Sequence, residues 1–307
     1  MGFLPDTQTY SLKKVFPLSA TLDRDTFMKA PLVLLTALFI ASAHQTLRGE
    51  TSGDWTYSVS DNQATITSYS GAGGAVDIPA VVNEISVVKV GDDSSSIFGD
   101  GNTTVTSVTI PDSVTSIGDY AFDSCTSLAS ITIPDSVTSI GNDAFNSCSS
   151  LASITIPESV TSIGDSAFAY CTSLTSITIP DSVTSIGDYA FLACTSLTNI
   201  AVEDGNLNYS SVDGVLFNKL QTLLVQYPDG ILDNSYTIPD SVTSIGDYAF
   251  SYCSSLTSVT IADSVTSIGD YAFYACTNLT SVTVATCVPS SGDYAFYLCT
   301  SLTSITL

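Results

Sequence analysis

The chain has 307 residues, of which 44% are hydrophobic and only 12% are charged, so it contains ample material for a buried core. Seven Lys and Arg residues stand against thirty Asp and Glu residues, which gives a formal net charge of −23. Nucleic acids and anionic lipid surfaces are bound through basic patches, so this acidity argues against both as partners.

The N-terminal 43 residues contain the pattern of a secretory signal peptide. Lys29 precedes the apolar run APLVLLTALFIASA, which ends in the small-residue site Ala41-Ser42-Ala43. This run is too short for a transmembrane helix, which needs about 20 apolar residues. Residues 1–43 are therefore predicted to be an N-terminal extension and signal peptide, with Met28 as the true start. The mature chain is expected to be secreted or held at the cell surface, without a membrane span; a buried helix is the alternative.

Residues 44–86 separate this leader from the repetitive part of the chain. The stretch WTYSVSDNQATITSYSG alternates apolar and polar residues, which is typical of strands. The open end of a stacked array exposes unpaired backbone, so residues 44–86 are expected to form an N-terminal β cap.

A repeat of 23 residues fills residues 87–204 and returns at residues 241–307. In the copy SVTSIGDYAFDSCTSLASITIPD (Ser113 to Asp135), Ile131 and Ile133 alternate with polar residues and predict a strand that ends at Pro134. Ala121, Phe122 and Cys125 have the spacing of one helical face, which predicts a short helix. Copies begin at Ser113, Ser136, Ser159, Ser182, Ser241, Ser264 and Cys287.

One copy is too short to bury its own apolar side chains, so neighbouring copies must stack in register. The predicted fold is an α/β solenoid of 23-residue coils, with a parallel β-sheet on one side and short helices or turns on the other. Identical residues should form internal columns, with Leu on Leu, Phe on Phe and Cys on Cys.

The pattern Leu-x-x-Ile-x-Ile-Pro-x-x-Val-x-x-Ile-Gly-x-x-Ala-Phe-x-x-Cys resembles the BspA-like class of leucine-rich repeat. Residues 205–240, which interrupt the repeats, include YSSVDGVLFNKLQTLLVQYP, and this stretch is similar to an insert common in that family. We interpret it as a β-hairpin that turns near Asn218-Lys219. The resemblance implies a surface protein involved in attachment to host matrix or to other cells.

The final copy departs from the pattern, because CVPSSG replaces SVTSIG and the chain stops within a strand at Leu307. We expect no C-terminal cap, and the open strand predicts end-to-end self-association.

The cysteines recur at one repeat position, inside an apolar pattern, so they are expected to be free, buried thiols; disulfides are the alternative. Cys287 has no assigned partner. The cysteines at the repeat position are Cys125, Cys148, Cys171, Cys194, Cys253, Cys276 and Cys299.

Catalysis is not expected. The chain has one histidine, His44, so no Ser-His or Cys-His nucleophile pair is available. We predict neither an enzyme nor a cofactor.

Acidic residues form two columns, one after the repeat's glycine and one after its proline. Stacked carboxylates suggest a calcium ladder. However, Asn142 replaces Asp in the first column and caps a helix as well as Asp does, so helix capping and turn formation are favoured and no metal site is predicted. The first column contains Asp119, Asn142, Asp165, Asp188, Asp247, Asp270 and Asp293.

The outward residues of the predicted strands are the first candidate binding surface, since the sheet of leucine-rich repeats usually contacts partners on that side. Solvation alone is an equally good explanation of their polarity. The residues are Ser130, Thr132, Ser153, Thr155, Ser176, Thr178, Ser258, Thr260, Ser281, Thr283, Ser304 and Thr306.

Tyrosines are the second candidate surface, because binding sites favour aromatic anchors. Variable positions after the repeat's Phe contain Tyr170, Tyr252, Tyr274 and Tyr297, and a further column contains Tyr120, Tyr189, Tyr248, Tyr271 and Tyr294.

The leading hypothesis is a non-enzymatic exported protein that binds other proteins or glycans at the cell surface, as an adhesin does. The alternatives are a surface-ordering solenoid, whose hydroxyl rows bind ice or mineral, and a passive spacer.

Overall fold

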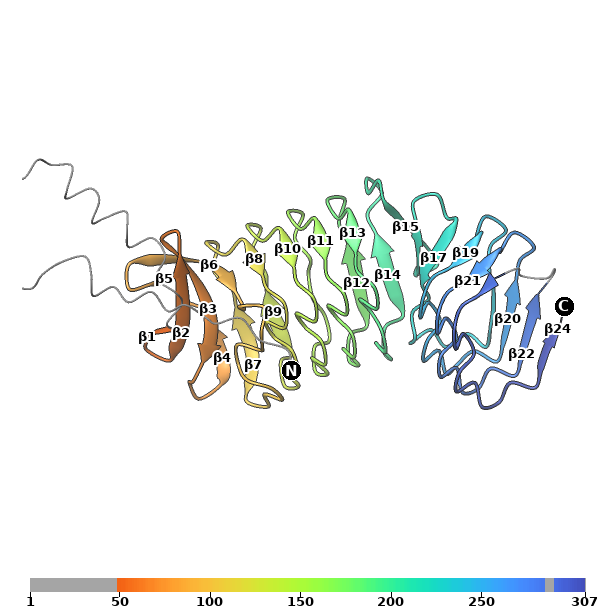
Figure 1. Ribbon diagram of the computed structural model, residues 1–307, viewed down its shortest axis with the longest axis horizontal. Helices are drawn as coiled ribbons and strands as arrows, with labels where there is room; N and C mark the ends of the chain where they lie inside the picture. Colours follow the sequence, from red (N-terminus) through yellow and green to blue (C-terminus); the bar gives the residue numbers. More distant parts are fainter. Residues whose placement is uncertain (1–48, 285–289, 307) are drawn as a thin grey trace, which may run out of the picture. The chain divides into compact units, whose positions relative to one another are not determined.

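A regular coil contributes two short parallel strands and one turn to a column of turns (Figure 1), but residues 151–157 form no strand. The computed structural model describes residues 49–284 and 290–306. The predicted leader, His44 and Cys287 therefore lie outside the described residues. Most of the strands that the coils contribute pair with the neighbouring coil at an offset of 23 residues, as in the pairing of Ser139 with Ser162.

The Thr-Ser-Ile segments of the coils before the insert form the first sheet, together with the strands that precede them. Its order is β1 (Glu50–Ser52), β2 (Trp55–Ser60), β3 (Gln63–Tyr69), β6 (Ile85–Val90), β8 (Ser116–Ile117), β10 (Ser139–Ile140), β11 (Ser162–Ile163) and β13 (Ser185–Ile186), with β5 (Val81–Val82) beside β6.

The Ser-Ile-Thr-Ile segments of the coils form a second line of parallel strands, which is interrupted at residues 151–157. It is divided into three sheets: β4 (Gly74–Asp77), β7 (Val105–Thr109) and β9 (Ser130–Thr132); β12 (Ser176–Ile179) and β14 (Asn199–Val202); and β18 (Ser235–Thr237), β20 (Ser258–Ile261), β22 (Ser281–Val284) and β24 (Ser304–Thr306).

The residues before the first repeat form an antiparallel meander of β1, β2 and β3, whose last strand pairs in parallel with β6. Trp55 lies 4.5 Å from Tyr69 and 6.5 Å from Phe98, measured between ring centroids. Phe98 in turn lies 6.0 Å from Phe122, the first Phe of the regular repeats. The meander therefore covers the apolar interior of the first coil and continues its aromatic packing.

Like residues stack on like residues through the core, as the repeat predicts. The rings of Phe122, Phe145 and Phe168 follow one another at 5.2 and 5.4 Å, and they are within 8° of parallel. The leucines of the same coils are fully buried. From Cys148 onward, each thiol at the repeat position donates to the carbonyl of a Phe or Tyr 26 residues earlier, for example Cys171 Sγ to Phe145 O at 3.2 Å.

The predicted short helices are wrong: residues 49–284 and 290–306 contain no helix. Tyr120 and Ser124 have φ values of 58° and 56°, in the left-handed region, and later copies repeat this geometry. Alternate backbone N–H groups of this segment donate to the next coil; for example, Phe122 N donates to Ala144 O at 2.8 Å. The intervening ones close local turns, such as Asp123 N to Tyr120 O at 2.9 Å. The backbone N–H groups that a helix would use for its internal hydrogen bonds thus bind the neighbouring coil instead.

The insert after β14 forms an antiparallel meander of β15 (Tyr209–Val212), β16 (Val215–Asn218) and β17 (Leu223–Gln226). The chain reverses at Asp213-Gly214 and again between Asn218 and Leu223. Strand β17 then pairs in parallel with β19 (Ser244–Ile245), and β21 (Ser267–Ile268) and β23 (Ser290–Ser291) follow.

A buried amide fixes the start of this insert. Asn206 is fully buried; its Nδ2 donates to Pro180 O at 2.6 Å and to Val183 O at 3.0 Å, and its Oδ1 accepts from Asn208 N and Tyr209 N. All of its hydrogen-bonding capacity is used, so the insert is firmly joined to the preceding coil.

The insert also divides the core. Strand β16 places Leu216 in the apolar cluster of the preceding coils, and it places Val215 and Phe217 in the cluster of the following ones. One strand thus contributes to both cores.

A carboxyl group is buried where the second core begins. Asp229 is 5% exposed; its Oδ1 lies 3.9 Å from Cys253 Sγ, and its Oδ2 has no hydrogen-bond partner among the described residues. Burial raises the pKa of Asp229 well above its ordinary value.

The folded protein therefore holds this proton more tightly than the unfolded chain does. Stability from this group is fully present below the unfolded-state pKa of 3.8 and falls as pH rises toward the folded-state value, with a limiting slope of about 1.4 kcal/mol per pH unit. Asp229→Asn should have a higher Tm than the parent at about pH 8 and a flatter Tm profile between about pH 5 and pH 8. Asp233→Asn, an exposed neighbour, is the control. Parallel profiles for parent and Asp229→Asn would contradict this expectation.

Candidate functional site

The outward Ser and Thr residues of the second line of strands form two rows in register. Ser130 pairs with Ser107 and Thr132 with Thr109, while Ser258 pairs with Ser281 and Thr260 with Thr283. The threonines of these strands are exposed, and the serines are exposed or half-buried. Ser153 and Thr155 are exposed without forming a regular strand. The backbone of β24 aligns Ser304 and Thr306 with Ser281 and Thr283.

Two further pairs extend these rows. Ser107 and Thr109 lie on β7, and Ser235 and Thr237 on β18 pair with Ser258 and Thr260. The motif Ser-x-Thr-Ile-Pro-Asp, which SYTIPD preserves at the end of the insert, was the available signal for the second pair. The rows are broken at β14, where Asn199 and Ala201 take the two positions.

Within the part of the chain that the structure describes, the Ser and Thr hydroxyl groups of these rows form no hydrogen bonds. Other Thr side chains are engaged: Thr138 Oγ1, for example, donates to Thr115 O of the preceding coil at 3.2 Å. The rows thus present unused donors and acceptors to solvent, but they contain no aromatic or charged anchor.

Tyrosines project from the turn column instead. Tyr189, Tyr248, Tyr271 and Tyr294 form one file, with ring centroids 4.6, 4.9 and 5.2 Å apart. The contact between Tyr189 and Tyr248 spans the insert, so coils separated by 36 extra residues in sequence lie side by side on this face. Sequence spacing gave no signal of this junction. Tyr120 stands apart from the file, because Asp143 and Ser166 occupy its position in the next two coils.

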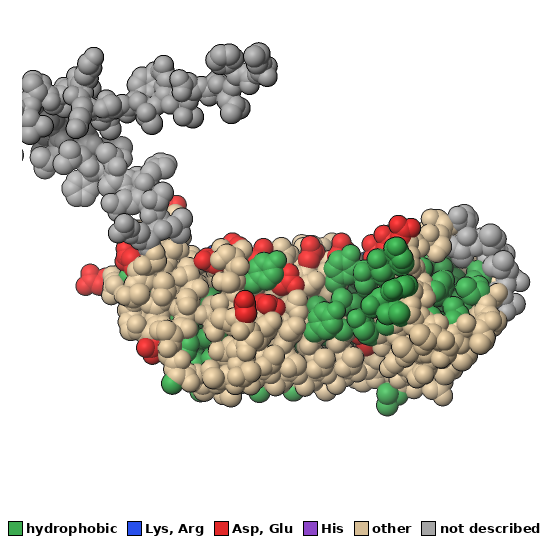
Figure 2. All heavy atoms as spheres, turned by 60° about the horizontal axis from the view of Figure 1, so that its bottom comes forward, with side chains coloured by type: hydrophobic (Ala, Val, Ile, Leu, Met, Phe, Trp, Pro, Cys, Tyr) green, Lys and Arg blue, Asp and Glu red, His purple; other side chains and the backbone are tan. Residues whose placement is uncertain are grey.

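The second group, Tyr170, Tyr252, Tyr274 and Tyr297, joins the first. Tyr252 lies 6.5 Å from Tyr170 and 5.4 Å from Tyr274, and Tyr271 lies 5.8 Å from Tyr274, between ring centroids. We call the two groups together the tyrosine face. Figure 2 shows it as a large patch with acidic side chains along its border.

Part of the tyrosine face is hollow. A cavity of about 290 Å³ is lined by Tyr170, Tyr189, Tyr248, Tyr252 and Tyr274, together with Ser166 and Leu192. Burial, with a smaller contribution from the neighbouring Tyr170, raises the pKa of Tyr252 above its ordinary value. Its hydroxyl is therefore neutral and can both donate and accept hydrogen bonds.

The first acidic column borders this face and has a structural role that differs from the expected one. Asp119 Oδ1 accepts from Asn142 N at 2.7 Å, and Asn142 Oδ1 accepts from Asp165 N at 2.8 Å. The same link joins Asp247 to Asp270 and Asp270 to Asp293. The expectation of helix capping is thus wrong, because these side chains bind the backbone of the next coil. The described residues contain no group of three or more acidic, His or Cys residues arranged to hold a metal ion.

The described cysteines are free, and six of the seven are buried, as the apolar repeat position predicts. Burial raises the pKa of Cys125 to about 11, and it raises the pKa values of Cys148, Cys171, Cys194 and Cys253 well above the ordinary thiol value. Among the seven cysteines that the structure describes, Cys299 alone is partly exposed.

The profile of the BspA type leucine rich repeat region matches residues 94–223 and 232–307, with six copies. The chain belongs to the BspA-type leucine-rich repeat family. Leucine-rich repeat proteins of this kind are generally surface or binding proteins. A search of curated protein sequences gives no match.

Two solved structures are similar in fold to this chain. A leucine-rich repeat protein from Eubacterium ventriosum is 27% identical with a TM-score of 0.67, over 84% of this chain and 71% of the other. The pneumococcal vaccine antigen PcpA is 23% identical with a TM-score of 0.61, over 84% of this chain and 87% of the other. No helix of sufficient length and hydropathy to cross a membrane is found in residues 49–284 and 290–306.

The thiol column makes a chemical prediction, since only thiolates react rapidly with disulfide reagents. In a Cys287→Ser variant, we expect no more than one thiol, that of Cys299, to react with Ellman's reagent in the native state. All seven remaining thiols should react after unfolding in guanidinium chloride. Rapid native-state reaction of several thiols would contradict a closed cysteine column.

Proposed function

We propose that this protein is an exported, non-enzymatic binding protein, whose tyrosine face contacts proteins or glycans at the cell surface. The single observation that carries the proposal is the gathering of Tyr170, Tyr189, Tyr248, Tyr252, Tyr271, Tyr274, Tyr294 and Tyr297 on one partly exposed face. Export rests on the predicted signal peptide, and an adhesive role is consistent with the family.

Tyrosine is favoured at binding surfaces because its ring buries a large apolar area while its hydroxyl retains a hydrogen-bonding partner. The face also has a core and a rim. Tyr248, Tyr252 and Tyr274 are half-buried, whereas Tyr294 and Tyr297 are 61% and 51% exposed. Half-buried rings are already held by their neighbours, so a partner would immobilise few side chains on binding.

The repeats supply a conservative way to test this role. Tyr248 and Tyr252 occupy positions at which other copies carry Ser166 and Ser147, with similar positive φ values. Tyr248→Ser combined with Tyr252→Ser should thus fold normally. We expect it to reduce binding to the proteins or glycans that the parent captures on a matrix-protein and glycan array by at least about tenfold.

Ser176→Ala combined with Thr178→Ala, in the hydroxyl rows, is the matched control and should bind as the parent does. Circular dichroism and Tm confirm that each variant is folded. Undiminished capture by the tyrosine variant would show that binding occurs elsewhere.

The hydroxyl rows support a second candidate, the ordering of ice or mineral at a surface. The observation in its favour is the register of exposed or half-buried, unengaged Ser and Thr hydroxyls within two sheets, across β7 and β9 and across β18, β20 and β22. If the rows act in this way, the protein should produce thermal hysteresis or slow crystal growth, and Thr178→Val combined with Thr260→Val should alter the effect. The absence of either effect at high protein concentration removes this candidate.

A further inference from the structure

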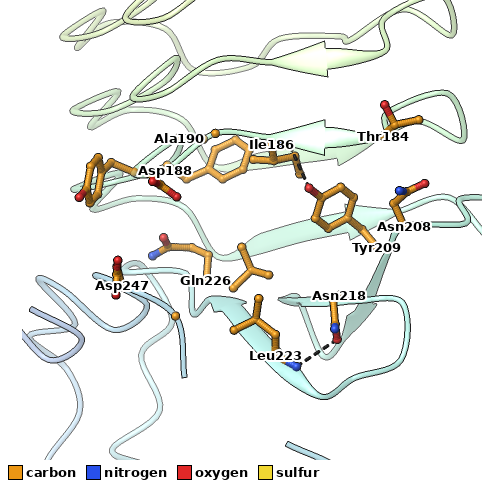
Figure 3. A pocket seen from close by; sticks show the side chains of 15 residues that line it. Thr184, Ile186, Asp188, Ala190, Asn208, Tyr209, Asn218, Leu223, Gln226 and Asp247 are labelled. Carbon is orange, nitrogen blue, oxygen red and sulfur yellow. Dashed lines mark hydrogen bonds between the residues drawn. The ribbon is translucent and has the colours of Figure 1, made fainter. Parts of the chain in front are cut away.

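The insert opens a cavity beside the tyrosine face. Strand β13 ends the first sheet and β17 lies on the other side of the interruption, so the coils cannot close upon each other here. A cavity of about 300 Å³ lies between them (Figure 3). Ile186, Leu223 and Val225 supply its apolar wall, and Asp188, Asp247 and Gln226 supply polar groups.

Asp188 lacks the side-chain link to the next coil that Asp119, Asp165, Asp247 and Asp270 make. Asp165 Oδ1 accepts from Asp188 N at 2.9 Å, and Asp247 Oδ1 accepts from Asp270 N at 2.7 Å. The coil after Asp188 is replaced by the insert, and no backbone N–H of the described residues donates to the Asp188 carboxylate. Both of its oxygens are therefore available to a ligand, and in Figure 3 the Gln226 amide extends toward the space between Asp188 and Asp247.

Tyr189 joins this cavity to the tyrosine face. It lines the cavity at the insert and also the neighbouring tyrosine-lined one, it contacts Tyr248, and it remains 37% exposed. A ligand that occupies the cavity at the insert could thus extend over a series of aromatic rings, whose faces attract cations.

The negative charge around the cavity at the insert favours a positively charged ligand. The described residues contain two lysines: Lys89 forms an ion pair with Asp93, and Lys219 Nζ donates to Asp204 O. Neither lines the cavity. Figure 2 shows no Lys or Arg side chain on the face that carries the patch, within the described part. With a net charge of −23, the protein attracts positively charged partners and repels acidic glycans.

We propose that the partner is a basic protein segment, which places an arginine in the cavity at the insert and lays its following residues along the tyrosine face. The guanidinium group donates to the Asp188 carboxylate as a fork, and its plane stacks on Tyr189. Asp247, which also lines the cavity, adds a second negative charge that favours the guanidinium group. This inference rests on the proposed function and names the class of its partner.

Fluorescence anisotropy with the full chain tests the proposal. The probes are a labelled Arg-containing peptide, the same peptide with Lys or Gln in place of Arg, an acidic peptide and a neutral oligosaccharide. We expect the Arg peptide to bind most tightly, the Lys peptide more weakly, and the Gln and acidic peptides not at all. Added salt should weaken binding of the Arg peptide.

The repeats again provide a matched pair of variants. Asp188→Asn should weaken Arg-peptide binding by about tenfold or more, because it removes the charge that faces the guanidinium group. Asp119→Asn removes the same charge from the same column away from the cavity, and Asn142 shows that this position accepts Asn. We expect Asp119→Asn to change binding by less than about twofold.

Three results would overturn the inference: equal binding of the Arg and Gln peptides, an Asp188→Asn variant that binds as the parent does, or binding of the neutral oligosaccharide alone. Such results leave the proposed function standing if Tyr248→Ser with Tyr252→Ser still reduces capture on the array. If the tyrosine variant gives the same array signal as the parent, the proposed function itself is contradicted.

Discussion

Every feature of this protein depends on hydrogen bonds and stacked rings between one coil and the next, in register. The turn column donates forward, as Phe122 N does to Ala144 O, while the cysteines donate backward, as Cys148 Sγ does to Phe122 O. The Phe rings add near-parallel contacts. A coil is thus held on both sides by copies of its own pattern, which is why a short sequence can repeat with few changes.

This constraint explains why the turn segment is not helical. Tyr and Ser in the left-handed region each carry a conformational cost, of about 1–2 kcal/mol relative to a right-handed geometry. The geometry persists because it directs alternate N–H groups toward the neighbouring coil, where they find carbonyl partners. The same turns point Tyr side chains outward and Phe side chains inward, so the core and the candidate binding face arise from one local conformation.

The candidate site was only partly predictable. Exposed hydroxyl rows follow from strand alternation, and tyrosine columns follow from repeat spacing. The junction of Tyr189 with Tyr248 does not, because it depends on how the insert is accommodated between coils. Likewise, the special position of Asp188 comes from the loss of the coil that would have used its carboxylate. Asp229 and Asn206 gave no signal in the sequence, since nothing in their local context predicts that a polar side chain will be enclosed.

The sequence by itself determined the repeat length, the alternation of strands, the columns of Leu, Phe and Cys, and the family, because each of these is a periodic property that needs no knowledge of distant contacts. Only the tertiary structure decided that two lines of parallel strands form, that turns replace the helices, and that the insert leaves a cavity between Asp188 and Asp247. The physical reason is that a backbone N–H group has one hydrogen to donate. Whether it closes a helix or links two coils depends on whether a neighbouring coil lies within reach.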